Sequence, residues 1–233
     1  MSVRVRAWAL LRHEARLQYR YGIYAAYGFV IAVYVAVLVA VAPLLPAWGT
    51  AAIVFTDPSA LGFFFLGALM MLERNEGVRR ALAAAPVTAR DYLAAKVATL
   101  TGMAVLASMV LTLFLHRPAA PALLILAVVL TSLQYVGIGV PIALRFRTVS
   151  GYLVGSTGFL TPLIAPGFLA LLDPMPDWLL LVPAASQFRL MLVATGAVAA
   201  DPVQILTMLA VAALAALAAL WYALWALRKE LGK

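Results

Sequence analysis

Six long apolar runs separated by short polar segments account for most of the chain. A hydrocarbon layer about 30 Å thick is crossed by about 20 apolar helical residues. The pattern therefore predicts an all-α polytopic membrane protein, with six transmembrane helices in one transmembrane domain over residues 1–233. The runs lie at Gly22 to Pro43, Pro58 to Leu72, Leu93 to Leu115, Ala119 to Leu144, Gly151 to Leu172 and Val203 to Leu227.

The second run is short for a full crossing. We expect the span to include residues Ala51 to Phe55 as well. A break is expected at the outer membrane face, where Asp57 would be an N-cap and Pro58 would take the first helical position. On this interpretation Asp57 lies at a helix end, and the interiors of the six spans contain no ionisable group.

The polar segment before the first run is typical of an interfacial helix. Residues 1–21 are basic and amphipathic, and Trp8 would anchor the helix in the headgroup plane. No small-residue cleavage site follows early in the chain, so we expect no cleavable signal peptide and a retained N-terminus.

Composition and charge agree with a membrane location and add an orientation. Hydrophobic residues make up 66% of the chain, its mean hydropathy is +1.03, and cysteine is absent. Of the 17 Lys and Arg residues, all but Arg117 and Arg189 lie in the segments on one side of the predicted spans. The positive-inside rule then places both termini in the cytoplasm. We expect a multi-pass protein of a bacterial or archaeal inner membrane. The net charge of +8 is explained by this topology and by attraction to lipid headgroups, so nucleic acid is not an expected partner.

Motifs for chemistry within the chain are missing from the sequence. The only Gly-Lys pair, at Gly232, ends the chain with no Ser or Thr after it, so there is no phosphate-binding loop. The two histidines, His13 and His116, do not form a zinc motif and lie outside the spans. We therefore expect no enzymatic activity, no metal and no bound cofactor. A membrane-embedded enzyme would need a nucleophile, base or metal cluster that is not found, and a passive channel or scaffold is a further alternative.

A polar island interrupts the apolar sequence after the second run. It consists of residues 73–80, Glu-Arg-Asn-Glu-Gly-Val-Arg-Arg, and suggests a docking surface for a partner in the water. Small apolar residues with helical spacing continue from Val78 to Ala85, which predicts a short amphipathic helix. Thr88 to Asp91 then has the pattern of a capping box that starts the third span, and Pro86 ends what precedes it.

The island and its surroundings resemble permeases of the type-2 family of ABC transporters. The shared pattern here is Glu73 to Gly77, Leu82, Pro86 to Thr88 and then Tyr92 to Lys96. The resemblance covers the whole chain and includes short outer helices before the last span, at residues 173–202. Arg16 to Tyr24 and Asp57 to Phe65 further resemble fluoroquinolone-export permeases.

The resemblance implies a function and partners. The helix at residues 73–87 would be a cytoplasmic coupling helix, docked on ABC ATPase subunits that bind ATP and Mg, and a second permease copy or a homologous permease would complete an export path. The cargo would be an amphipathic small molecule such as a fluoroquinolone, which implies drug efflux and antibiotic resistance. Export of a lipid or polysaccharide precursor is the alternative cargo. The residues implied in coupling are Glu73, Arg74, Glu76, Gly77, Leu82 and Pro86.

Candidates for a substrate path come from polar residues in the fourth and fifth runs. The fifth run is rich in Gly and Pro, which lipid tolerates only where freed backbone groups meet protein or water. Uncharged aromatic and hydroxyl groups suit an amphipathic cargo, although dense packing between helices would explain the same residues. The candidates are Ser132, Gln134, Tyr135, Tyr152, Thr157 and Thr161.

Overall fold

A computed structural model describes residues 3–41, 44–77, 87–115 and 118–231. These residues form helices and connecting segments, with no strand among them. The elements are α1 (Val3–Arg20), α2 (Ile23–Val41), α3 (Gly49–Asn75), α5 (Ala89–Leu115), α6 (Pro121–Ala143), α7 (Val149–Ile164), η2 (Ala165–Leu171), η3 (Asp177–Leu181), α8 (Pro183–Thr195) and α9 (Pro202–Leu231).

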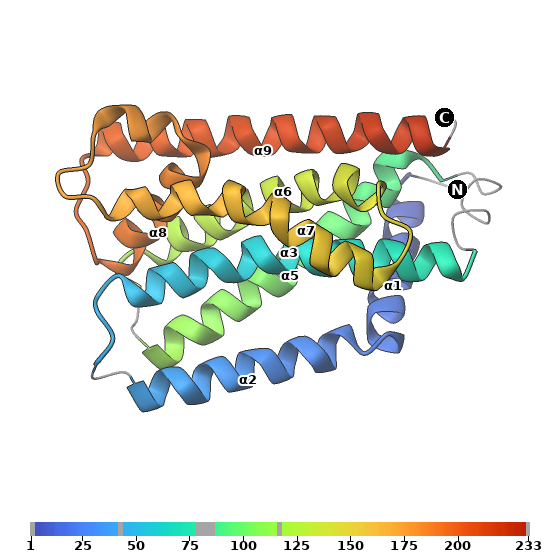
Figure 1. Cartoon of the computed structure of the whole chain (residues 1–233), viewed down its shortest axis with the longest axis horizontal. Coiled ribbons are helices and arrows are strands. Elements are labelled where there is room, and N and C mark those ends of the chain that lie inside the picture. Colours follow the sequence, from blue (N-terminus) through green and yellow to red (C-terminus); the bar gives the residue numbers. More distant parts are fainter. Residues whose placement is uncertain (1–2, 42–43, 78–86, 116–117, 232–233) are drawn as a thin grey trace.

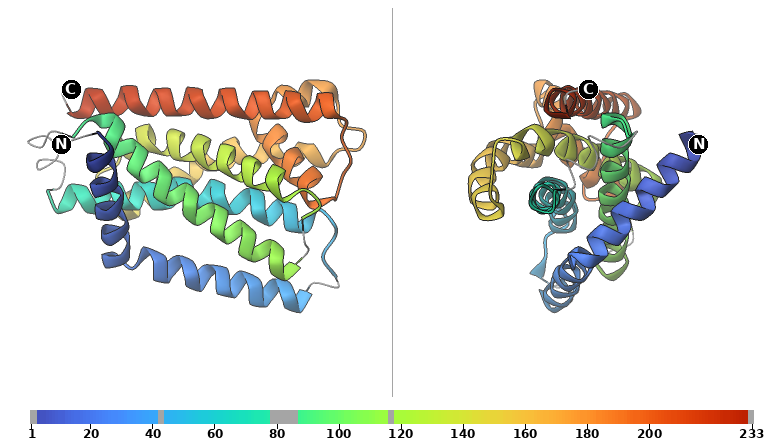
Figure 2. Two further views of the ribbon diagram at one scale, coloured as in Figure 1. Left: turned by 180° about the vertical axis from the view of Figure 1, so that it is seen from behind. Right: turned by 90° about the vertical axis from the view of Figure 1, so that its right-hand side faces the viewer.

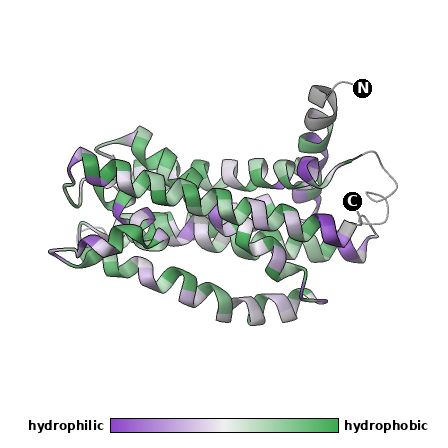
Figure 3. Cartoon of the chain, turned by 90° about the horizontal axis from the view of Figure 1, so that it is seen from above, coloured by the Kyte–Doolittle hydropathy of each residue, from purple (hydrophilic) through white to green (hydrophobic). Residues whose placement is uncertain are grey.

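Six helical segments of the described chain are long and apolar enough to cross a membrane, which confirms the predicted fold class. They are α2, α3, α5, α6, α7 with η2, and α9. Their apolar residues face both the interior and the surroundings, and hydrophilic residues gather toward the ends of the bundle (Figure 3). Large apolar side chains such as Phe29, Leu217 and Trp221 are exposed, as lipid-facing side chains would be.

The second span differs from the prediction. α3 runs without a break from Gly49 to Asn75, so Asp57 and Pro58 lie inside the helix and the expected N-cap is wrong. Asp57 is buried, and its carboxylate accepts a hydrogen bond of 2.5 Å from the hydroxyl of Tyr27 on α2. The expectation of spans without ionisable groups is therefore also wrong, because burial and a tyrosine partner accommodate Asp57 within α3.

Both termini lie at the same end of the bundle, and α1 runs across that end at a steep angle to the spans (Figure 1). We call this the basic end; it contains the end of α3, the start of α5, the α6–α7 connection and the end of α9. Viewed along the spans, α3 is surrounded by other helices (Figure 2). It packs against α5, α6, α7 and α8.

Helix α6 packs closely on α3 and α9 because small residues line the contacts. A side chain at Gly137 would meet the backbone of Ala219 at 2.7 Å. The alanine ridge of α9, which includes Ala212, Ala216 and Ala223, is buried as well. These small side chains allow α9 and α6 to approach each other closely.

One local prediction at a helix end is also confirmed. Thr88 accepts a hydrogen bond of 3.2 Å from the backbone N–H of Asp91, and the Asp91 carboxylate accepts one of 3.2 Å from the backbone N–H of Thr88. This is the capping box at the start of α5. In the fifth span the α-helix ends at Ile164 and continues as the 3-10 helix η2, where Pro166 interrupts the regular pattern.

At the opposite end of the bundle, the chain folds back between the fifth and sixth spans. η3 and α8 occupy residues 177–195, within the segment expected to form short outer helices. Most of α8 is buried among η2, α3, α6 and α9, with Phe188 stacked on Phe55 of α3. Gly196 ends α8 in a left-handed conformation with φ of 81°.

Candidate functional site

The candidate site is a buried cluster of charged side chains at the basic end. Lys96 of α5 lies between two carboxylates, with Nζ 2.8 Å from Oε1 of Glu14 and 2.5 Å from Oε1 of Glu73. The Tyr92 hydroxyl donates a hydrogen bond of 2.5 Å to the other oxygen of Glu73. The side chains of Lys96, Glu14 and Glu73 are 0%, 6% and 2% exposed. We call Glu14, Glu73, Tyr92 and Lys96 the charged cluster.

Local helix geometry explains how the charged cluster forms. Tyr92 and Lys96 are four residues apart on α5, so their side chains lie on one face of that helix. Glu73 is in the last turn of α3, and Glu14 is on α1, which packs against α5. Burying ionised groups costs several kcal/mol per ion, and the cost is offset only when partners and hydrogen bonds are in place. The cluster therefore fixes the relative positions of α1, α3 and α5.

A second contact docks α1 on α5 beside the charged cluster. The amide nitrogen of Gln18 donates a hydrogen bond of 2.7 Å to the hydroxyl of Thr99, and it also lies 3.4 Å from Oε1 of Glu14. Glu14 and Gln18 are four residues apart, so one polar face of α1 points into the protein. Trp8 on the same helix is 68% exposed, as expected for a residue in contact with headgroups.

Two further residues of the polar island, Arg74 and Glu76, contact other elements. Arg74 donates a hydrogen bond of 3.3 Å to the backbone carbonyl of Phe146, in the α6–α7 connection. Glu76 forms an exposed ion pair of 2.7 Å with Arg20 at the end of α1. Gly77 follows α3 with φ of 71°, a left-handed conformation that favours glycine. The island therefore joins α3 to α1, α5 and the α6–α7 connection.

Charge and burial at this junction also act on Tyr21, which follows α1. Burial, together with the neighbouring carboxylates of Glu76 and Glu73, raises the pKa of Tyr21 to about 12. The phenol therefore stays protonated across the physiological range.

The structure corrects the expected position of Glu73. Glu73 and Arg74 belong to the last turn of α3, so a coupling helix does not begin at residue 73. The Glu73 side chain is buried and paired with Lys96 within the chain, and its role in coupling stays a prediction. Leu82 and Pro86, the other residues implied in coupling, lie outside the described residues. Glu14 was missed by sequence reasoning, although its spacing from Gln18 on an otherwise amphipathic helix is the signal that could have found it.

The six candidate path residues fall into two groups by burial. Ser132, Gln134, Tyr135 and Tyr152 are buried, while Thr157 and Thr161 are exposed on α7. The hydroxyls of Thr157 and Thr161 donate to backbone carbonyls one turn earlier.

The four buried candidates hold neighbouring helices together. Ser132 shares a hydrogen bond of 3.0 Å with Thr101 of α5. Gln134 accepts one of 2.8 Å from Gln187 of α8. Tyr135 donates to the carbonyl of Leu163 at 3.2 Å, and Tyr152 donates to that of Phe63 at 2.5 Å. In this conformation their polar groups are used for packing between helices.

No group of three or more His, Asp or Glu side chains in the described ranges is placed to hold a metal ion. The charged cluster contains its own cation, Lys96, between its two carboxylates. Its arrangement can transmit a displacement between helices, since a shift of α3 or α5 must carry the paired side chains with it or break their contacts.

Comparison with known proteins decides the family. Residues 5–231 match the model of the fluoroquinolones export permease protein family. The chain belongs to this family. It is also 26% identical, over 197 residues, to the fluoroquinolones export permease proteins of Mycobacterium tuberculosis strains CDC 1551 / Oshkosh and ATCC 25618 / H37Rv. The alignment covers 84% of this chain and 83% of each relative. No solved structure matches the chain.

Membership in this family identifies the chain as an ABC permease, as the sequence predicted, and supports a role as a transport subunit. The six apolar helices agree with a multi-pass membrane protein. The family match spans all the described contacts of the charged cluster, from Glu14 on α1 to Lys96 on α5.

Proposed function

We propose that this chain is the membrane-spanning subunit of an ABC exporter that moves an amphipathic drug-like molecule outward, with ATP hydrolysed by separate cytoplasmic subunits. The family match over residues 5–231 is the observation that carries the proposal. The printed names of the two mycobacterial relatives favour a fluoroquinolone as the cargo. Two copies of the chain, or this chain and a homologous permease, would enclose the path.

The charged cluster supports a specific role for the basic end. Residues 78–86 connect the end of α3 to the start of α5, and Glu73 and Lys96 pair 2.5 Å apart near those two ends. A force applied to the connecting segment by an ATPase would therefore move α3 and α5 together. Because Glu14 also binds Lys96, α1 would follow the same movement. Rigid displacement of packed helices is a general route from an inward-facing to an outward-facing state.

Drug accumulation tests the export function. The chain is expressed with its cognate ATPase in a drug-sensitive host, and intracellular fluoroquinolone is measured. We expect lower accumulation than in cells with a catalytically inactive ATPase. Equal accumulation in both strains would reject drug export, and loss of a surface glycolipid on deletion of the chain would then favour the lipid or polysaccharide alternative.

Coupling to the ATPase is tested by a matched pair of substitutions. Leu82→Asp introduces a charge into the segment proposed to contact the ATPase, whereas Leu44→Asp introduces the same charge at an exposed site that follows α2 at the opposite end. We expect Leu82→Asp to reduce copurification of the ATPase and Leu44→Asp to retain it. Equal copurification would contradict the proposed docking segment.

Orientation is tested by cysteine labelling, because the chain has no native cysteine. We expect Val3→Cys and Leu231→Cys to react with an impermeant maleimide only from the cytoplasm. Asp177→Cys, in η3 at the opposite end, should react only from outside. Outside labelling of either terminal position would invert the proposed topology.

A further inference from the structure

A groove between α5 and α9 opens at the basic end of the bundle. A cavity of about 320 Å³ lies at its end and a second one of about 390 Å³ continues along the helices. Arg90 lines both cavities, so the two spaces meet at its side chain. The first cavity is also lined by Thr88, Ala89 and Arg228, and the second by Leu93, Ala94, Val97, Ala98, Leu220 and Leu224.

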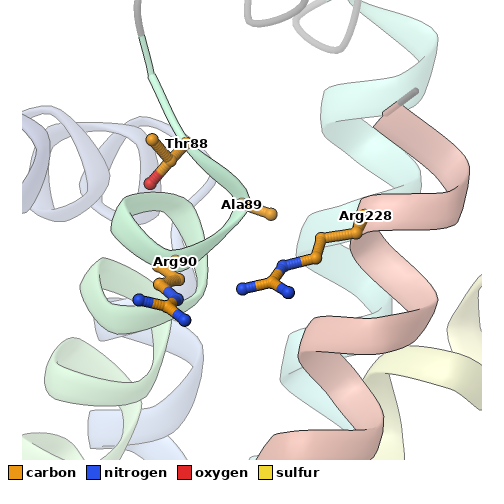
Figure 4. A pocket seen from close by; sticks show the side chains of 4 residues that line it. All are labelled: Thr88, Ala89, Arg90 and Arg228. Carbon is orange, nitrogen blue, oxygen red and sulfur yellow. The ribbon is translucent and has the colours of Figure 1, made fainter. Parts of the chain in front are cut away.

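Two arginines face each other across the end of this groove. Figure 4 shows the guanidinium of Arg228 extending from α9 toward that of Arg90 on α5. Both side chains are exposed, and neither forms an ion pair with another described residue. Asp91, the nearest acid in the sequence to Arg90, is hydrogen-bonded to Thr88. Two like charges held close together repel, so an anion between them would be stabilised by both.

The remainder of the groove is apolar. Beyond Arg90 its walls are leucine, valine and alanine side chains, and the exposed Ala94 and Ala98 leave space between α5 and α9. A small soluble anion would use the guanidiniums and leave this apolar length empty. An occupant that fills the whole groove must combine a negative group with a long hydrocarbon tail.

We propose that the α5–α9 groove binds one anionic phospholipid. Its phosphate lies between Arg90 and Arg228, and an acyl chain lies along Leu93, Val97 and the facing leucines of α9. Arg90 is in the first turn of α5 and Arg228 in the last turns of α9, so both guanidiniums are at the depth of the headgroups when these helices span the bilayer. Juxtamembrane Arg and Lys residues attract anionic headgroups in this way.

Charge and location favour a lipid over an amphipathic drug anion. The groove is open between two spans, where the bilayer presents phospholipid at high local concentration. Helix α5 forms one wall of the groove, and on another face it carries Tyr92 and Lys96 of the charged cluster. An occupied groove would therefore support the helix that the cluster fixes. This inference rests on the membrane-spanning fold and not on the proposed transport activity.

The test uses the purified full chain in nanodiscs that contain phosphatidylglycerol and phosphatidylcholine. Native mass spectrometry measures the lipid retained after gentle release. We expect one retained phosphatidylglycerol, and about a tenfold lower affinity for it in Arg90→Ala/Arg228→Ala, because hydrogen bonds to charged groups are lost. The matched control is Arg145→Ala/Arg147→Ala, which removes the same charge from exposed residues of the α6–α7 connection.

Three results would overturn the proposal. The first is equal retention of phosphatidylglycerol by the groove variant and the control variant. The second is equal retention of phosphatidylglycerol and phosphatidylcholine by the unmodified chain. The third is release of the bound phosphatidylglycerol by a fluoroquinolone but not by excess lipid, which would identify the drug as the occupant.

A groove-filling variant provides an independent measurement. Ala98→Phe keeps both arginines and occupies the apolar length, so it should lower retention of long-chain phosphatidylglycerol while a short-chain analogue binds unchanged. Thermal unfolding of each variant in the same nanodiscs verifies that the chain is folded. Unchanged long-chain retention in folded Ala98→Phe would contradict the acyl-chain position.

Discussion

The basic end and the half of the bundle that contains α8 are held together by different polar chemistry. At the basic end, Lys96 pairs with Glu14 and Glu73, so the contacts are ionic. Around α8 the corresponding contact is neutral, with Gln187 donating to Gln134 at 2.8 Å. An ion is less costly to bury near the headgroups than at the centre of a bilayer. The comparison indicates that strong ionic contacts are used where α1 can cover them, and weaker amide contacts are used deeper in the bundle.

The largest effect on stability is expected when the buried ion pairs of the basic end are broken. Lys96→Met leaves two carboxylates buried without their cation, which costs about 3–5 kcal/mol when one partner of a buried ion pair is removed. We expect a marked decrease in the thermal unfolding temperature of the purified chain. Lys229→Met, at an exposed residue of α9, is the control. Equal unfolding temperatures for the two variants would show that the charged cluster does not stabilise the fold.

Loss of the neutral contact between Gln134 and Gln187 should lower stability less. Gln134→Leu leaves the buried Gln187 amide without its acceptor, with an expected loss of about 1–3 kcal/mol. The double substitution Gln134→Leu/Gln187→Leu removes both polar groups and should recover part of the loss. The measurement is the free energy of unfolding of the single and double variants. A simple amide pair would be contradicted if the double variant lost more free energy of unfolding than the two single variants lose in total.

The contact of Tyr27 with Asp57 combines both kinds of chemistry, because a carboxyl group meets a neutral donor inside a span. Tyr27→Phe removes the donor and keeps the ring, which packs edge-on against Phe65. We expect a loss of about 1–2 kcal/mol from the unsatisfied carboxyl group. Tyr34→Phe, at an exposed tyrosine of the same helix, is the matched control. Equal stability of the two variants would show that the hydrogen bond does not stabilise the fold.

The smallest effect is expected at the exposed ion pair of the basic end. Arg20→Ala removes the partner of Glu76, and their side chains are 69% and 38% exposed. Solvent screens such a pair, so the loss of unfolding free energy should be about 0.5 kcal/mol or less and should vanish in high salt. If Arg20→Ala lost as much unfolding free energy as Lys96→Met, burial would not explain the expected difference in strength between exposed and buried ion pairs.

Hydrophobic pattern was sufficient to predict the six spans, since the number of apolar residues needed to cross a bilayer is fixed by helix geometry. Turn chemistry was sufficient for the capping box at Thr88 and Asp91, because its hydrogen bonds are local. The break predicted at Asp57 was wrong because the deciding contact is not local. Asp57 and Pro58 favoured a helix start by local signals, but the distant Tyr27 supplies a partner that allows the carboxyl group inside α3.

The amino-acid sequence by itself determined the membrane class, the helix periodicity, the basic segments and the family pattern around Glu73. Only the tertiary structure decided what Glu73 does. Its partner Lys96 is 23 residues away in the chain, and Lys96 also pairs with Glu14, 82 residues before it. No local pattern specifies that these three residues meet. The same holds for Gln134 and Gln187, and for Arg90 and Arg228. Side-chain spacing within one helix follows from its 3.6-residue turn, but contacts between helices depend on how whole helices pack against one another.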